Sequence, residues 1–154
     1  RKQQLNQNLM LFFTGFSRFS SDIQQTTEKA LVDKQKQLLE MLSLVDDAEK
    51  VLTSKTDLNE FGRLLDYTWK LKRGISNRIS TDSIDGLYAK GMVAGALGGK
   101  LLGAGGGGFL LFYVEPDKQE AVHKAMEELL YVPFEFENSG TRVIHYTPET
   151  YEKR

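Results

Sequence analysis

The sequence predicts an α+β domain: a mostly antiparallel four-stranded sheet with helices packed on one side, in a split β-α-β (ferredoxin-like) order with inserted helices. Two observations lead to this prediction. Apolar runs of strand length occur near both ends of the chain, and the long stretch between them has apolar residues at helical spacing. With 154 residues and 40% hydrophobic content, the chain can bury one core. We therefore expect residues 1–154 to form a single domain.

Four segments have the character of strands. The first, Leu9 to Thr14, is a compact apolar run that ends at a glycine. The second, Phe109 to Val114, is apolar on both alternating faces, which is typical of an interior strand covered on both sides. Residues 132–137 and 142–146 are two further candidates, joined by a turn-rich Asn-Ser-Gly link. These four segments supply the predicted sheet.

The intervening segments are expected to be helical. A long stretch before residue 52 repeats apolar residues at helical spacing, and the capping pattern D-x-x-E occurs twice later in the chain. A stripe of apolar and small residues predicts one more helix between these two patterns. The helices are expected at residues 21–52, from Asp57, from Asp82 and from Asp117.

The charge balance limits the classes of partner. The chain has 20 basic and 21 acidic residues and a net charge of −1, so it has no general positive field for nucleic acid or an anionic membrane. Any anion site must be local. The chain contains no cysteine, which excludes a disulfide framework and a thiolate nucleophile, and we expect a cytoplasmic protein. No signal peptide opens the sequence and no apolar run is long enough to span a bilayer.

Glycines concentrate in one short segment. Seven of the 14 glycines lie between Gly98 and Gly108, directly before the apolar run. Glycine loses much conformational entropy on folding, so such a cluster indicates turns with φ > 0 or a close approach of the backbone to another group. Exposed N–H groups in such loops bind anions. We predict a phosphate-proximal or substrate-proximal loop; a flexible or tightly packed connection between a helix and a strand is the alternative.

Two familiar nucleotide motifs do not explain this segment. Gly103, Gly105 and Gly108 satisfy G-x-G-x-x-G, but that fingerprint must follow a strand and open a helix, and here the predicted order is reversed. A Walker loop would need a glycine six positions before Lys100, where Ala94 stands.

A longer match indicates a family. The run from Lys100 to Gly108, KLLGAGGGG, resembles the late motif K-x-x-G-A-G-x-G-G of the GHMP small-molecule kinases. The flanking segments LMLFFTGFSR and GALGGKLLGAGGGGFLLFY are most similar to the sugar kinases of this family that phosphorylate D-glycero-D-manno-heptose 7-phosphate. The resemblance extends over nearly the whole chain.

The resemblance implies that this chain is the C-terminal half of an ATP-dependent sugar-phosphate kinase. In these kinases the N-terminal half supplies the ATP-phosphate loop and usually the acidic residues that hold Mg²⁺ and assist the attacking hydroxyl. No P-x-G-x-G-S-S-type run occurs in this sequence, and the chain begins at Arg1 rather than Met. We therefore expect ATP and Mg²⁺ to bind in the full-length enzyme and neither to bind this half alone. The expected partners are the N-terminal half and a small sugar phosphate.

The resemblance also implies which residues approach the ligand. Main-chain groups of the glycine loop would meet phosphate or sugar, at Gly103, Ala104, Gly105 and Gly106. Lys100 is a candidate supporting cation, or else a cap for the last carbonyls of the preceding helix. No catalytic residue is expected in this half. Isolated histidines such as His123 and His145 are more often structural or surface residues than metal ligands, so we predict no metal site.

A second group of candidates lies where the first strand becomes a loop. Thr14, Gly15 and Arg18 are candidate contacts for a substrate phosphate, because a guanidinium can bind phosphate through a bidentate fork. A solvent-exposed arginine is the alternative for Arg18.

Two other function classes need to be weighed. An RNA-binding module would suit a sheet-and-helix domain of this size, and GGFLLFYV faintly resembles an aromatic RNP1 strand. The balanced charge and the equally apolar second face of that strand argue against it. A non-catalytic regulatory domain that binds a small ligand remains open. A nucleotide-loop sequence upstream of Arg1 would distinguish a kinase half from such a binding domain.

Overall fold

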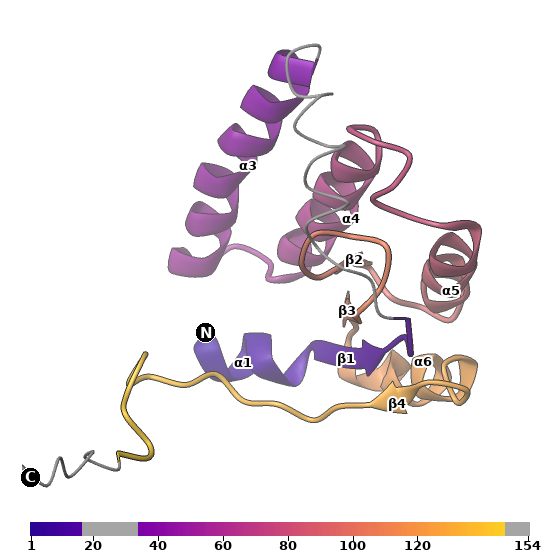
Figure 1. Ribbon diagram of the computed structural model, residues 1–154. Helices are drawn as coiled ribbons and strands as arrows, with labels where there is room; N and C mark the ends of the chain where they lie inside the picture. Colours follow the sequence, from indigo (N-terminus) through magenta and orange to yellow (C-terminus); the bar gives the residue numbers. More distant parts are fainter. Residues whose placement is uncertain (17–33, 147–154) are drawn as a thin grey trace, which may run out of the picture.

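The computed structural model describes residues 1–16 and 34–146. In these residues four strands form one antiparallel sheet in the order β2-β3-β1-β4. Figure 1 shows the sheet with its helices. In chain order the elements are α1 (Lys2–Gln7), β1 (Leu9–Phe13), α3 (Gln35–Thr53), α4 (Asn59–Arg73), α5 (Asp82–Val93), β2 (Gly98–Leu101), β3 (Phe109–Tyr113), η2 (Pro116–Lys118), α6 (Gln119–Ala125) and β4 (Leu130–Tyr131). This is the split β-α-β order with α3 and α4 inserted, so the predicted α+β class is confirmed, although helices cover both faces of the sheet and not one side alone.

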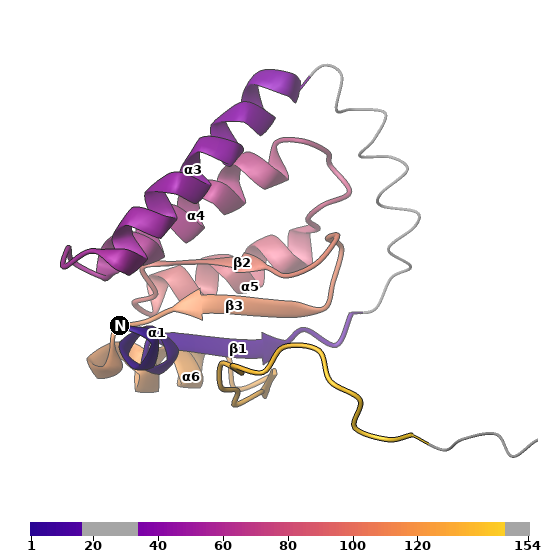
Figure 2. The same cartoon turned by 90° about the vertical axis from the view of Figure 1, so that its left-hand side faces the viewer.

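The two faces of the sheet have separate cores. On one face, Met10 and Phe12 of β1 and Leu110 and Phe112 of β3 pack in one cluster with residues of α5 and α6. On the other face a smaller cluster forms around Tyr113 and includes residues of α1 and α4. Figure 2 shows α5 and α6 together behind the sheet, with α4 above β2 and α3 outside α4. Helices α3 and α4 contribute to both clusters, with Trp69 in the first and Phe61 and Leu65 packed against the second.

Helix α4 lies unusually close to β2 because both elements carry a glycine at their contact. A Cβ atom placed on Gly98 would stand 1.8 Å from the carbonyl oxygen of Gly62. Only hydrogen atoms fit in that space. This approach brings the C-terminal turn of α4 to the same end of the sheet as the glycine loop that follows β2.

Strand β2 was not predicted. Its sequence, GGKL, lies inside the glycine-rich segment, and glycine has low strand propensity. The strand forms because it pairs with β3 in a hairpin, with Gly99 opposite Phe112. The ring of Phe112 lies over Gly99, whose added Cβ would stand 2.8 Å from that ring. The hairpin also changes the setting of the glycine loop, which joins two strands rather than a helix and a strand.

The two C-terminal strands were predicted wrongly. The last described strand, β4, has only two residues and lies before the predicted segment 132–137. Val132 donates one more main-chain hydrogen bond, to the Leu11 carbonyl (2.8 Å), but Pro133 has no N–H to continue the ladder. Beyond it the chain bonds to Asn6 of α1 instead of the sheet. Residues 142–146 form no strand.

The helix predictions were more accurate. The described part of the predicted helix 21–52 is α3, and residues 21–33 lie outside the described residues. Asp57 precedes α4 and accepts a hydrogen bond from the Asn59 N–H (3.0 Å), so the start is confirmed. The start of α5 at Asp82 is also confirmed, although the side chain that caps it belongs to Thr81. Helix α1 was not predicted.

Candidate functional site

The loop between β2 and β3, residues 102–108, requires glycine at most of its positions. Gly103, Gly105, Gly106 and Gly108 have φ values of 83°, 119°, 74° and 108°. Other residues adopt this region only with strain, so the sequence has glycine at these positions for a geometric reason. The predicted positive-φ loop is confirmed.

Two hydrogen bonds fix the position of the loop. The N–H of Gly106 donates to the Ile79 carbonyl, and that of Gly108 donates to the Phe16 carbonyl, both at 2.9 Å. Gly105 lies against the backbone of Ile79, because a Cβ on Gly105 would be 2.6 Å from the Ile79 oxygen. The loop is therefore held on both sides by segments far from it in sequence.

Several other main-chain N–H groups of the loop donate no hydrogen bond to the described residues. No described residue accepts a hydrogen bond from the main-chain N–H of Gly103, Ala104, Gly105 or Gly107. A backbone amide without a protein partner binds water or a ligand. Clustered amides of this kind are able to bind an anion, so the loop is a candidate site for phosphate oxygens.

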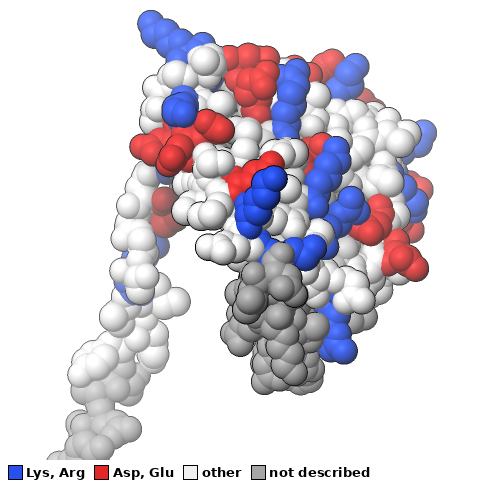
Figure 3. All heavy atoms as spheres, turned by 90° about the horizontal axis from the view of Figure 1, so that it is seen from above, with Lys and Arg blue, Asp and Glu red and all other residues white. Residues whose placement is uncertain are grey.

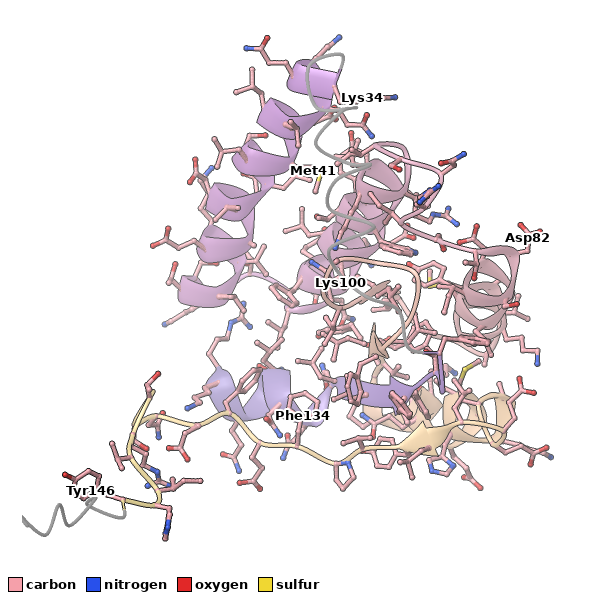
Figure 4. The ribbon with its side chains drawn as sticks, in the orientation of Figure 1. Lys34, Met41, Asp82, Lys100, Phe134 and Tyr146 are labelled. Atoms are coloured by element: carbon pink, nitrogen blue, oxygen red, sulfur yellow. The ribbon has the colours of Figure 1, made fainter. Side chains whose placement is uncertain are left out.

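Two lysines add positive charge to the loop. Lys72, in the last turn of α4, donates a hydrogen bond from Nζ to the Gly103 carbonyl (2.5 Å). Burial of its side chain, together with the nearby charge of Lys100, lowers the pKa of Lys72 below its ordinary value. A bound anion near both ammonium groups would relieve their repulsion. Figure 4 labels Lys100 near the loop, and Figure 3 shows Lys and Arg side chains gathered in the middle of the face seen from above.

The cationic neighbours of Lys72 in α4 form ion pairs with carboxylates, unlike Lys72. Lys70 pairs with Asp66 (2.6 Å) and Arg73 pairs with Asp85 (2.7 Å). Within residues 1–16 and 34–146, no carboxylate forms an ion pair with Lys72 or Lys100. The two lysines at the loop thus lack a protein counter-ion among these residues. Sequence reasoning missed Lys72, because K-L-K-R at the end of a helix looks like an ordinary set of cations at the negative pole of the dipole.

The other candidate residues have different placements. Lys100 lies in β2, opposite Leu111, so the alternative that it caps the preceding helix is wrong. Thr14 is buried, and its hydroxyl donates to the Gly108 carbonyl (2.9 Å) and accepts from the Gly108 N–H (3.2 Å). Thr14 therefore fastens the end of the glycine loop to β1. Gly15 is exposed with φ of 74°, and Arg18 lies outside the described residues.

The described residues contain neither a membrane-spanning helix nor a cluster of metal ligands. None of the helices found in residues 1–16 and 34–146 is long and apolar enough to cross a membrane. In the same part of the chain, His, Asp and Glu side chains form no group of three that could hold a metal ion.

The glycine loop and its hairpin lie in a segment with a known family model. Residues 48–132 match the model described as GHMP kinases C terminal. This chain belongs to the GHMP kinases. The match extends from the end of α3 to the residue after β4, so it includes α4, the glycine loop and both lysines.

Individual relatives agree with this assignment. The chain is 32% identical to a D-glycero-alpha-D-manno-heptose 7-phosphate kinase of Campylobacter jejuni over 143 residues, which cover 90% of this chain and 42% of the relative. It is 36% identical to a mevalonate kinase of Pyrococcus abyssi over 89 residues, or 56% of this chain and 26% of the relative. This GHMP domain thus spans less than half the length of either relative.

A solved structure shows the same fold. The crystal structure of the Methanococcus jannaschii mevalonate kinase superposes with a TM-score of 0.67 at 23% identity, covering 80% of this chain and 37% of that kinase. The likeness supports the split β-α-β architecture of the GHMP domain and its inserted helices.

Proposed function

We propose that this GHMP domain is the C-terminal half of an ATP-dependent sugar-phosphate kinase, and that its glycine loop binds phosphate in the cleft between the two halves. The observation that carries the proposal is the set of main-chain amides at Gly103, Ala104, Gly105 and Gly107 that donate to no described residue, with Lys72 and Lys100 beside them. Phosphoryl transfer depends on positioning and on stabilising the negative charge of the transferring group. Amides and ammonium groups held by the fold supply both.

The same residues do not fit a magnesium site. Mg²⁺ binds through carboxylates, water and phosphate oxygens, and the loop contains no carboxylate. We assign Mg²⁺, the ATP cradle and the group that accepts the proton of the attacking hydroxyl to the N-terminal half, as the family resemblance implies. ATP bound there supplies the phosphoryl group. In this proposal, the residues of this half hold phosphate oxygens.

D-glycero-D-manno-heptose 7-phosphate is the proposed acceptor, supported by the Campylobacter jejuni relative and by the segments that flank the loop. In a panel of acceptors, the full-length parent protein should release ADP with this sugar phosphate and not with mevalonate. The 154-residue chain alone should release none. Turnover with mevalonate only would move the protein to another branch of the family. A parent that phosphorylates neither acceptor would favour a regulatory domain that binds a small ligand.

Lys72→Met in the parent is expected to lower kcat/KM by roughly 10-fold to 100-fold, because a charge-assisted hydrogen bond to phosphate is worth about 1.5–3 kcal/mol. Steady-state kinetics with each substrate varied in turn would show whether ATP or the sugar phosphate loses affinity. Lys70→Met is the matched control, because Lys70 lies in the same helical turn but pairs with Asp66. It should change kcat/KM by less than about twofold, since exposed ion pairs contribute little. Equal effects of the two substitutions would remove Lys72 from the site.

A further inference from the structure

Residues 142–146, Arg-Val-Ile-His-Tyr, have strand character but form no strand. Their apolar side chains are almost fully exposed, with Val143 at 79%, Ile144 at 88% and Tyr146 at 79%. Exposed apolar residues occur singly on most proteins, but three within four positions of a strand-like segment indicate a contact surface. In an extended strand, Ile144 and Tyr146 would project from one face and Val143 from the other.

The sheet of this domain cannot accept the segment where it stands. The edge strand β4 has only two residues, and Pro133 ends the pairing. Asn6 of α1 then holds the chain through bonds to the Phe134 carbonyl (3.3 Å) and the Phe136 N–H (3.2 Å). In Figure 1 this part of the chain runs beneath β1 and α1 and then leaves the body of the domain.

The chain leaves the domain close to where it enters it. Lys2 donates a hydrogen bond from Nζ to the side chain of Asn138. A turn follows directly, in which Glu137 accepts hydrogen bonds from the N–H groups of Asn138 (2.7 Å) and Ser139 (3.0 Å). Gly140 then has φ of 64°. Any segment that precedes Arg1 must therefore join this domain near the point where residues 141–146 leave it.

We propose that residues 142–146 add as an edge strand to a sheet in the half of the parent protein that precedes Arg1. The inference rests on the proposed two-half organisation, and the length of the Campylobacter jejuni relative, of which this chain covers 42%, leaves room for such a half. Strand addition supplies main-chain hydrogen bonds along the segment, and the alternating side chains give it specificity. The strand would tie the two halves together beside their junction.

Hydrogen exchange on the full-length parent tests the pairing. The amides of residues 142–146 should exchange at least about tenfold more slowly than those of a free peptide with the same sequence, because strand hydrogen bonds protect them. Exchange at the free-peptide rate would overturn the proposal. Kinase activity measured on the same sample separates the two hypotheses. An active enzyme with an unprotected segment refutes only the strand, and an inactive protein with a protected segment refutes only the function.

Crosslinking identifies the segment that pairs with residues 142–146. Replacing Tyr146 with p-benzoylphenylalanine keeps an aromatic ring and allows photocrosslinking. Crosslinks within one molecule to peptides that precede Arg1 are the expected result. Crosslinks between two chains would show that a second copy accepts the strand, and crosslinks only within residues 1–146 would show that the segment folds back. Either outcome overturns the proposal.

A matched pair of substitutions measures the contribution of the contact. Ile144 and Val93 are almost equally exposed in this domain, at 88% and 90%, but Val93 ends α5, away from the tail. In the parent, Ile144→Ser should lower the melting temperature by roughly 5 °C or more, because it would remove a buried branched side chain. Val93→Ser should leave the melting temperature unchanged within about 1 °C. Equal shifts would show that Ile144 stays exposed.

Discussion

Gly105→Val in the full-length parent kinase is expected to lower kcat/KM by about 100-fold or more, because a displacement of about 1 Å in a positioning group can cost that much. Gly105 has φ of 119°, and an added Cβ would lie 2.6 Å from the Ile79 carbonyl oxygen. Rotation about χ1 does not move Cβ, so no rotamer of valine relieves this contact. The loop must move away from Ile79, and its main-chain amides move with it.

The loss of turnover should exceed the loss of stability, because Gly105 belongs to a surface loop and not to either core cluster. Gly95→Val is the matched control. Gly95 has nearly the same φ, 117°, but the atoms nearest to its added Cβ belong to the side chain of Lys118, at 3.2 Å and beyond, and not to a backbone. This variant has similar backbone strain, but at a position outside the glycine loop. Thermal melts and steady-state kinetics of both variants would distinguish the effect of backbone strain, which both share, from the effect of displacing the loop, which only Gly105→Val causes. If the Gly105 variant loses activity only in proportion to its melting temperature, the loop has a packing role.

Phe112→Ala is expected to destabilise the domain by about 3–5 kcal/mol, the usual cost of removing a large aromatic side chain from a core. Phe112 is fully buried in β3, an interior strand, where its ring stacks on Tyr88 (centroids 5.7 Å apart) and meets the edge of Phe12 (6.2 Å). Gly91 and Gly99 also lie within contact distance of the ring, and neither has a side chain that could fill the space it leaves.

Phe109→Ala in the same strand is the control for this substitution. Phe109 is 38% exposed and its ring contacts Phe13 (centroids 5.1 Å apart), so its removal should cost about 1 kcal/mol or slightly more. Denaturant unfolding of both variants measures the difference. A cost below roughly 1 kcal/mol for Phe112→Ala would place this ring on the surface and would reopen the nucleic-acid interpretation.

The sequence by itself determined the elements whose signals are local. The interior strands β1 and β3 follow from apolar runs that need cover on both faces, and α5 follows from the stripe Ile84, Leu87, Tyr88 and Gly91, all of which are buried. The glycine loop was predictable for a similar reason, since positive φ angles at successive positions demand glycine whatever surrounds them. The motif around this loop was also sufficient to indicate the family that the comparisons show.

Tertiary structure decided the features that depend on partners distant in sequence. Strand β2 forms from glycines because it pairs with β3 and because Phe112 and α4 lie close to its two faces. The strand-like residues 142–146 form no strand, because the chain stops pairing with the sheet at Pro133 and then leaves it. Lys72 comes to the loop only because Gly62 and Gly98 let α4 approach β2. Local patterns record which backbone conformations a residue tolerates. Which hydrogen bonds form, and which charges meet, depends on segments that only the folded chain brings together.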